Sequence, residues 1–385
     1  MRGRNKTNKK FMLLSAIGIF MVVDHHTFTA FNLFGTYIPY NSFFMPMFVF
    51  ISGYFNKVDD KTKLSSYIGR KAKNLLIPYA GISLLVFILQ QLINLFKSGE
   101  LYAYPSGYLA YVLERILTVG SFAAIAEPMW FVIALFAALL VYALLKKLLN
   151  KIWNSYIMFA IFCLLQFRVV YMAQNMDPEL LNRFLLPLKV LFFLPFLELG
   201  IIYREHLEKK HSELPGGVKI AVMFLMLVIN AIRTIYLPNP YDLAFDSIND
   251  LSGFTSPYFV TPLISSIIGI TFWLTMVELI SKALAESSFV NYLSCNTFWI
   301  MGLHIVFFNI LNCVLMIINE HIILLPYFDT AYFSESEWYY WEPCPAFKCV
   351  YVIFGILGPL ACKRLYDLLC SSFLKRKNVK PTDEV

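Results

Sequence analysis

Three ionisable residues in a row, Asp24, His25 and His26, lie inside an otherwise apolar stretch near the start of the chain. A stretch such as residues 11–31 is typical of a helix that crosses a membrane. Ionisable side chains at membrane depth are costly and usually line a polar cavity or a reaction centre. Because imidazole exchanges protons near neutral pH, the three residues predict proton-transfer chemistry. The alternative interpretation is an interfacial histidine pair at the end of a short helix.

The elements that must position these residues are indicated by composition. Hydrophobic residues make up 58% of the chain and charged residues only 15%, which excludes a soluble domain of this length and predicts an all-α polytopic membrane helix bundle. Apolar stretches long enough to span recur along the sequence and predict about ten transmembrane helices. They cover residues 11–31, 43–56, 74–96, 128–145, 152–171, 184–203, 217–236, 259–281, 294–318 and 347–362.

The distribution of basic residues predicts the orientation of the bundle. Short cytoplasmic loops accumulate Lys and Arg, and most of the 32 basic residues fall at the two ends of the chain and in every second loop. Both termini are therefore predicted to be cytoplasmic. Residues 1–370 are expected to form the transmembrane domain and 371–385 a basic cytoplasmic tail. This topology explains the net charge of +7, so we predict no binding of nucleic acid.

The second and third stretches carry two further patterns. In SFFMPMFVFISGYFNK, Pro46 is expected to break the helix, and Ser52 and Gly53 are expected to let another helix approach closely. In GRKAKNLLIPY, the basic residues are expected to end an inner loop just before the third helix, where an anionic cytosolic ligand could dock. They are Arg70, Lys71 and Lys73. The alternative is a topology-setting cluster that binds no ligand.

A carboxylate and an indole stand next to each other before the fourth stretch. Pro128 is placed to begin that helix, which would hold Glu127 at the positive end of the helix and Trp130 one turn in, facing the bundle. Such a pair could bind a sugar hydroxyl and cover its apolar face, or could merely cap and anchor the helix. An alternative acceptor site would use acidic residues of an outer loop. They are Asp242, Asp246 and Asp250.

Read in order, these segments resemble the acyltransferase-3 superfamily of bacterial multi-pass membrane acyltransferases, and most of all its fucose 4-O-acetylase-like branch. The similar pieces are VVDHHT, MPMFVFISGYF, RKAKNLLIPY, MWFVIALF, FFLPFLELG and LSCNTFWIMGLH. One departure is clear. The family commonly places an Arg eleven residues before the reactive histidine, where this chain has Leu14 or Ser15. Lys9 or Lys10 is the nearest replacement.

The resemblance implies transfer of an acyl group, usually acetyl from acetyl-CoA, to a hydroxyl of a surface polysaccharide or lipid-linked glycan. It implies a bacterial inner membrane location, acyl-CoA and a carbohydrate as partners, and no permanently bound cofactor. His25 is the expected general base, with His26 as the alternative and Asp24 or Glu127 as the carboxylate that orients it. The other predicted site residues are Arg70, Lys71, Lys73 and Lys10 for the donor, and Glu127, Trp130, Ser52 and His304 for the substrate. No metal-binding motif is present, so no metal is predicted.

The main competing class is a proton-coupled transporter or flippase. Broken helices and the intramembrane residues Asp24, Lys189 and Glu198 would suit such a carrier. Carriers of this kind usually show an internal duplication, and this sequence has none. A third class, a membrane protein without catalysis, leaves Asp24, His25, His26 and His304 without a role.

Overall fold

The structure is a computed structural model, which describes most of the chain. The described residues are 8–35, 37–58, 63–101, 106–118, 120–121, 124–236, 258–284, 287–325, 328–335 and 347–378. Every regular element within these ranges is a helix, and the chain is an all-α polytopic membrane bundle. The alternative acceptor residues Asp242, Asp246 and Asp250 lie outside the described residues.

The long helices follow the predicted apolar stretches, and each of the ten stretches overlaps one of them. They are α1 (Lys9–His25), α2 (Phe44–Tyr54), α3 (Leu64–Ser98), α5 (Trp130–Leu148), α6 (Ser155–Asn175), α7 (Pro178–Ile202), α9 (Gly216–Tyr236), α10 (Thr261–Leu284), α12 (Thr297–His321) and α14 (Lys348–Asn378). Shorter helices are α4 (Tyr108–Thr118), α8 (Glu208–Glu213), α11 (Ser288–Cys295) and α13 (Thr330–Glu335). A π-helical segment, Tyr203–Leu207, joins α7 to α8.

Eight helical segments among the described residues are long and apolar enough to cross a membrane. The two shorter helices in the predicted set are α1, with 17 residues, and α2, with 11. The total of ten spans therefore stays a prediction. The proposed tail boundary at residue 370 does not coincide with a structural boundary, because α14 continues to Asn378.

Helix α1 ends earlier than predicted, at His25 rather than near residue 31. The amides of Thr27 and Thr29 both donate to the carbonyl of Asp24, which turns the chain away from the helix axis. His25 thus lies at the end of a short helix and His26 is its C-cap. The alternative interpretation of the sequence also expected a helix end here, but the ring of His26 is directed at α12.

Helices α2 and α7 pack closely because a glycine lies on each side of their contact. A Cβ at Gly53 would lie 2.1 Å from the carbonyl oxygen of Leu197, and one at Gly200 would lie 2.2 Å from that of Phe50. The predicted close approach at Gly53 is confirmed. The prediction that Pro46 breaks the helix is wrong, since Pro46 occupies the first turn of α2, where no intrahelical amide bond is lost.

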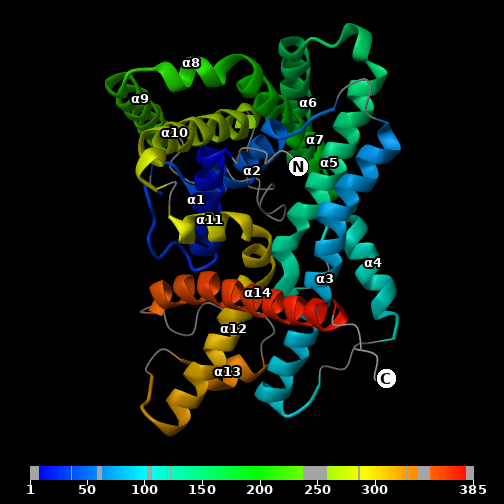
Figure 1. The fold of residues 1–385 in the computed structure, drawn as a ribbon, viewed down its shortest axis with the longest axis vertical. Coiled ribbons are helices and arrows are strands. Elements are labelled where there is room, and N and C mark those ends of the chain that lie inside the picture. The colour runs from blue at the N-terminus through cyan, green and yellow to red at the C-terminus, as the bar shows by residue number, and fades with distance from the viewer. Residues whose placement is uncertain are drawn as a thin grey trace, which may run out of the picture.

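Helix α1 is the centre of the arrangement. It contacts α2, α10, α11, α12 and α14, while α7 packs against α2, α5 and α6 (Figure 1). Most apolar side chains of α1 are buried, as expected for a helix that others largely enclose. The end of α1, with its histidines, lies against α2 and α12.

Candidate active site

The rings of His26 and His304 meet across the contact between α1 and α12. Their centroids are 4.8 Å apart. Each ring is held by its own helix, because Nδ1 of His26 donates to the carbonyl of Val22 at 2.7 Å and Nδ1 of His304 donates to that of Ile300 at 2.9 Å. A carbonyl only accepts, so in both neutral rings the acceptor nitrogen is Nε2. His304 is fully buried, and its Nε2 has no hydrogen-bond partner among the described residues.

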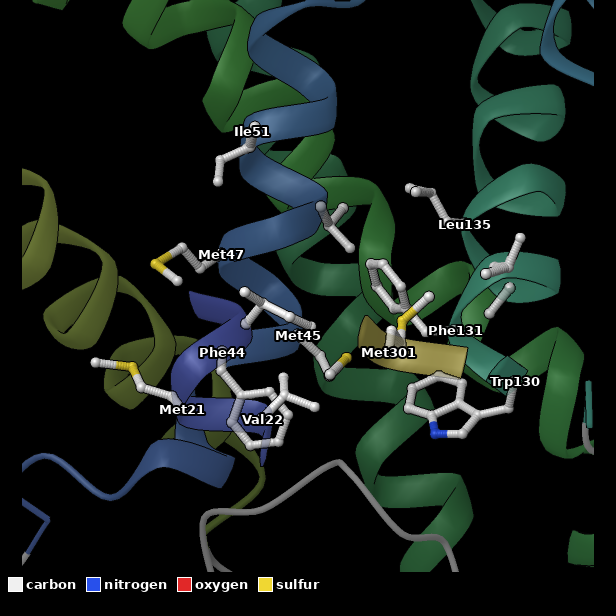
Figure 2. Close-up of a cluster of buried hydrophobic side chains, with 14 of the residues drawn as sticks. Met21, Val22, Phe44, Met45, Met47, Ile51, Trp130, Phe131, Leu135 and Met301 are labelled. Carbon is white, nitrogen blue, oxygen red and sulfur yellow. The ribbon is translucent and has the colours of Figure 1, made fainter. Parts of the chain in front are cut away.

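The surroundings of the histidine pair are apolar. The His25 ring lies 5.8 Å from that of His26 and 5.5 Å from that of Phe44 at the start of α2. Figure 2 shows Val22, Phe44, Met45, Met301 and Trp130 gathered from α1, α2, α12 and α5 into one buried cluster beside this region. An imidazole pair at the edge of such a cluster is well placed to exchange a proton with a substrate shielded from water.

Asp24 is fully buried and its carboxylate is directed into the loop that follows α1. It accepts the amides of Phe31 at 3.1 Å and Asn32 at 3.2 Å. The hydroxyl of Tyr40 accepts the amide of Leu33 at 2.6 Å and lies close enough to Asp24 for the carboxylate charge to act on it. Burial, reinforced by the Asp24 charge, raises the pKa of the Tyr40 hydroxyl, which therefore stays neutral. These contacts give Asp24 a role in holding the loop.

Trp130 faces the bundle, as predicted, because it is buried. It is the first residue of α5 and not one turn in, since a 3-10 segment that contains Glu127 and Pro128 precedes it. The indole is only 7% exposed, with the Lys189 ammonium 3.5 Å from its ring centroid and the Phe193 ring stacked against it. These neighbours cover much of the ring, and the use of Trp130 as a platform for a sugar stays a prediction.

Glu127 is half-buried in the same region. The cations of Arg115 and Lys189 are close enough to act on its carboxylate. Lys189 is itself 2% exposed, and the Arg115 guanidinium reaches Ser121. Glu127 thus lies near one cation from α4 and one from α7. Its carboxylate can therefore help to hold these two helices together.

Two other predicted site residues have structural partners. The Ser52 hydroxyl donates to the carbonyl of Phe48 in its own helix at 2.8 Å. The ammonium of Lys10 is buried between the carboxylates of Glu208 at 3.1 Å and Glu278 at 3.0 Å. Lys10 joins α1 to α8 and α10, and its charge is already balanced. Its assignment to the acyl donor is therefore not supported by the geometry.

The basic residues Arg70, Lys71 and Lys73 lie inside α3, whereas the sequence analysis expected an inner loop. Arg70 and Lys73 are exposed and three residues apart, so they are neighbours on one face of the helix. The cations of Arg70 and Lys71 lie 5.9 Å and 5.4 Å from the ring centroid of Tyr67. The structure thus presents a rigid basic face at the start of α3.

Sequence reasoning missed Tyr40 as the partner of Asp24 and did not pair His26 with His304. The signal for Tyr40 was weak, since a tyrosine before an apolar stretch is typical of any membrane interface. The pairing of the histidines had no local signal, because 278 positions separate them. Lys189 was noted as intramembrane, but its position against Trp130 depends on the packing of α5 on α7.

The fold is thus a membrane helix bundle with an imidazole pair beside a buried apolar cluster. Comparison with protein families identifies the chemistry. The sequence model of the acyltransferase-3 family, described as an acyltransferase domain, matches residues 11–362. The chain belongs to this family and is a multi-pass membrane acyltransferase. No curated protein and no solved structure matches the chain significantly.

Proposed function

We propose that this protein is an O-acyltransferase of the bacterial inner membrane that transfers an acyl group, in the simplest case acetyl, from acyl-CoA to a hydroxyl of a surface polysaccharide or lipid-linked glycan. Family membership supports the acyl transfer. The observation that carries the site is the His26–His304 pair. We assign the general base to His26, ahead of His25, because its ring is held by Val22 and directed at a second imidazole.

The proposed reaction uses the two imidazoles in turn. Nε2 of His26 takes the proton of the acceptor hydroxyl as its oxygen attacks the thioester carbonyl. The carbon–sulfur bond then breaks, and the thiolate of coenzyme A leaves with the proton from His26, so that an ester and a free thiol are the products. The buried acceptor nitrogen of His304 would stabilise the imidazolium formed between these steps.

The proposed donor site is the basic face at the start of α3. Coenzyme A carries several phosphate charges, and exposed Arg and Lys side chains on one helix face suit them. The predicted topology places this end of α3 at the cytosol, where acyl-CoA is made. A transporter is not proposed, because the family match does not favour it.

The first test replaces each histidine of the N-terminal pair. His26→Ala should lower acyl transfer by about 10²–10⁴-fold while the protein stays folded in the membrane, because the general base is lost. His25→Ala serves as the matched control and should keep most of the activity. The measurement is the O-acyl content of the surface glycan by mass spectrometry, together with protein level. If His25→Ala is inactive and His26→Ala is active, the general base is His25. Full activity in both variants would show that neither residue is the general base.

The second test concerns the donor. A double variant, Arg70→Gln with Lys73→Gln, should raise the KM for acyl-CoA far more than it lowers kcat, because a phosphate contact contributes equally to the ground state and the transition state. Lys209→Gln with Lys210→Gln removes the same charge from another predicted inner segment and should leave the KM unchanged. If both double variants disturb insertion alike, the basic face of α3 only sets topology.

A further inference from the structure

The loop between α1 and α2 is fixed by an unusual arrangement of hydrogen bonds. Three successive amides, those of Phe31, Asn32 and Leu33, are bound by only two side chains. The first two go to the buried carboxylate of Asp24 and the third to the hydroxyl of Tyr40. A carboxylate that accepts amide hydrogen bonds makes stronger contacts than a neutral group does. The backbone of this loop is therefore held directly from the end of α1.

The conformation of the loop is costly. Four of its residues that are not glycine have a positive φ, between 45° and 56°. They are Phe28, Thr29, Asn32 and Phe34. A left-handed conformation is disfavoured for bulky side chains and most of all for a β-branched residue such as Thr29. Backbone strain of this kind persists where the surrounding structure enforces it, and it gathers at sites that bind or react.

The loop presents aromatic rings to its surroundings next to the histidine pair. Phe28, Phe31, Phe34 and Tyr37 are 50%, 44%, 43% and 47% exposed. The ring of Phe31 rests on Phe20 of α1, and that of Phe34 rests on Phe272 and Trp273 of α10. The loop begins directly after His26, the C-cap of α1, and is therefore joined to the candidate active site through the backbone.

We propose that this aromatic loop, residues 28–35 and 37, is the acceptor-binding surface and that Asp24 is the positioning residue that holds it beside His26. The ligand class is a pyranose ring, whose apolar C–H face packs on aromatic side chains. Aromatic side chains that only enter lipid do not require a defined backbone conformation. Placing one sugar hydroxyl at a reacting imidazole does require one. This inference rests on the proposed function, and it replaces the expectation that Asp24 orients a histidine.

The test uses the full-length protein in lipid nanodiscs with acetyl-CoA and a panel of methyl glycopyranosides. Two rates are measured, acetyl transfer to the glycoside and hydrolysis of acetyl-CoA without it. Asp24→Asn should raise the KM for the glycoside about 10-fold, as expected when a charged hydrogen-bond partner is lost. The pH profile of hydrolysis should keep its wild-type shape, because the ring of His26 is held by Val22 and not by Asp24. Tyr40→Phe should act in the same direction.

Exposed positions keep the proposal testable if Asp24→Asn does not fold. Tyr37→Ala and Phe28→Ala remove exposed rings from the loop and should raise the same KM. Phe224→Ala removes a ring that is 65% exposed on α9 and should have no effect. The proposal is overturned if the loop variants behave like Phe224→Ala, or if Asp24→Asn lowers hydrolysis and transfer equally and shifts the pH profile. A wild-type protein that acetylates no glycoside would instead contradict the proposed function.

Discussion

The indole of Trp130 and the carboxylate of Asp24 have neighbours that decide how each side chain is used. Trp130 contacts the buried Lys189 ammonium and the Phe193 ring, so a residue type that suits sugar binding also contributes to packing and to a cation–π contact. Asp24 lies next to His25 in sequence, yet its oxygens bind loop amides. At the residue scale, function follows from what each polar or aromatic atom contacts.

A substitution at Trp130 separates the packing role from sugar binding. Trp130→Ala should destabilise the protein by about 3–5 kcal/mol, because a large buried ring is removed and the Lys189 cation loses its aromatic partner. Trp130→Phe should cost less, since a ring face remains. Thermal unfolding in detergent measures both. A Trp130→Ala variant that melts like the wild type but no longer modifies glycan would support the acceptor role.

Helices α2 and α7 meet through backbone atoms at Gly53 and Gly200. Small residues at helix contacts allow the close packing on which association in a membrane depends. This contact matters for the site, because α2 begins at Phe44, whose ring lies against His25. At the element scale, the position of His25, and of His26 next to it, therefore depends on a glycine contact that neither residue touches.

The α2–α7 contact predicts a large effect for a small change. Gly200→Ala should destabilise the protein by about 1–3 kcal/mol, since its Cβ would overlap the carbonyl of Phe50 and force the helices apart. Gly81→Ala in α3 is the matched control. Its Cβ would meet no atom within 4 Å, and alanine should stabilise a helix interior by about 0.5–1 kcal/mol. Melting temperatures that move alike in the two variants would contradict this account.

Across the whole molecule, ionic contacts join segments that are distant in sequence. Lys10 of α1 bonds to Glu208 of α8 and Glu278 of α10, and Arg204 donates to the carbonyls of Tyr54 and Asn56 at 2.7 Å and 2.6 Å. Lys10, Arg204 and Glu208 belong to segments that the distribution of basic residues predicts to be cytoplasmic. Tyr54, Asn56 and Glu278 lie near the predicted cytoplasmic ends of their apolar stretches. The contacts therefore gather one end of several helices at a single face.

The predicted topology can be tested directly. Green fluorescent protein fused to either terminus should fluoresce, because both termini are expected in the cytosol and the fusion does not fold after export. Alkaline phosphatase fused after residue 99 should be active, since the segment that follows α3 is predicted to lie outside. An active phosphatase at the C-terminus would require an odd number of spans and would contradict the even number predicted from the basic residues.

The sequence by itself determined the helix class, the approximate position of each long helix and the family. Twenty apolar residues without charge have few stable states in a bilayer other than a helix, so local composition was sufficient. The end of α1 was not predicted, because single backbone hydrogen bonds to the carbonyl of Asp24 decide it. The position of Pro46 was not predicted, because it depends on where α2 begins. A glycine on the second apolar stretch did predict a close helix contact, since only a small residue permits one.

The tertiary structure alone decided which ionisable residues meet. His26 and His304 are brought together by the contact of α1 with α12, Lys10 is balanced by carboxylates of two other helices, and Asp24 is taken up by the loop after α1. None of these pairings has a local pattern, because each depends on which faces of distant helices pack against each other. The free energy of a buried charge or imidazole is set by those neighbours and not by the residue type.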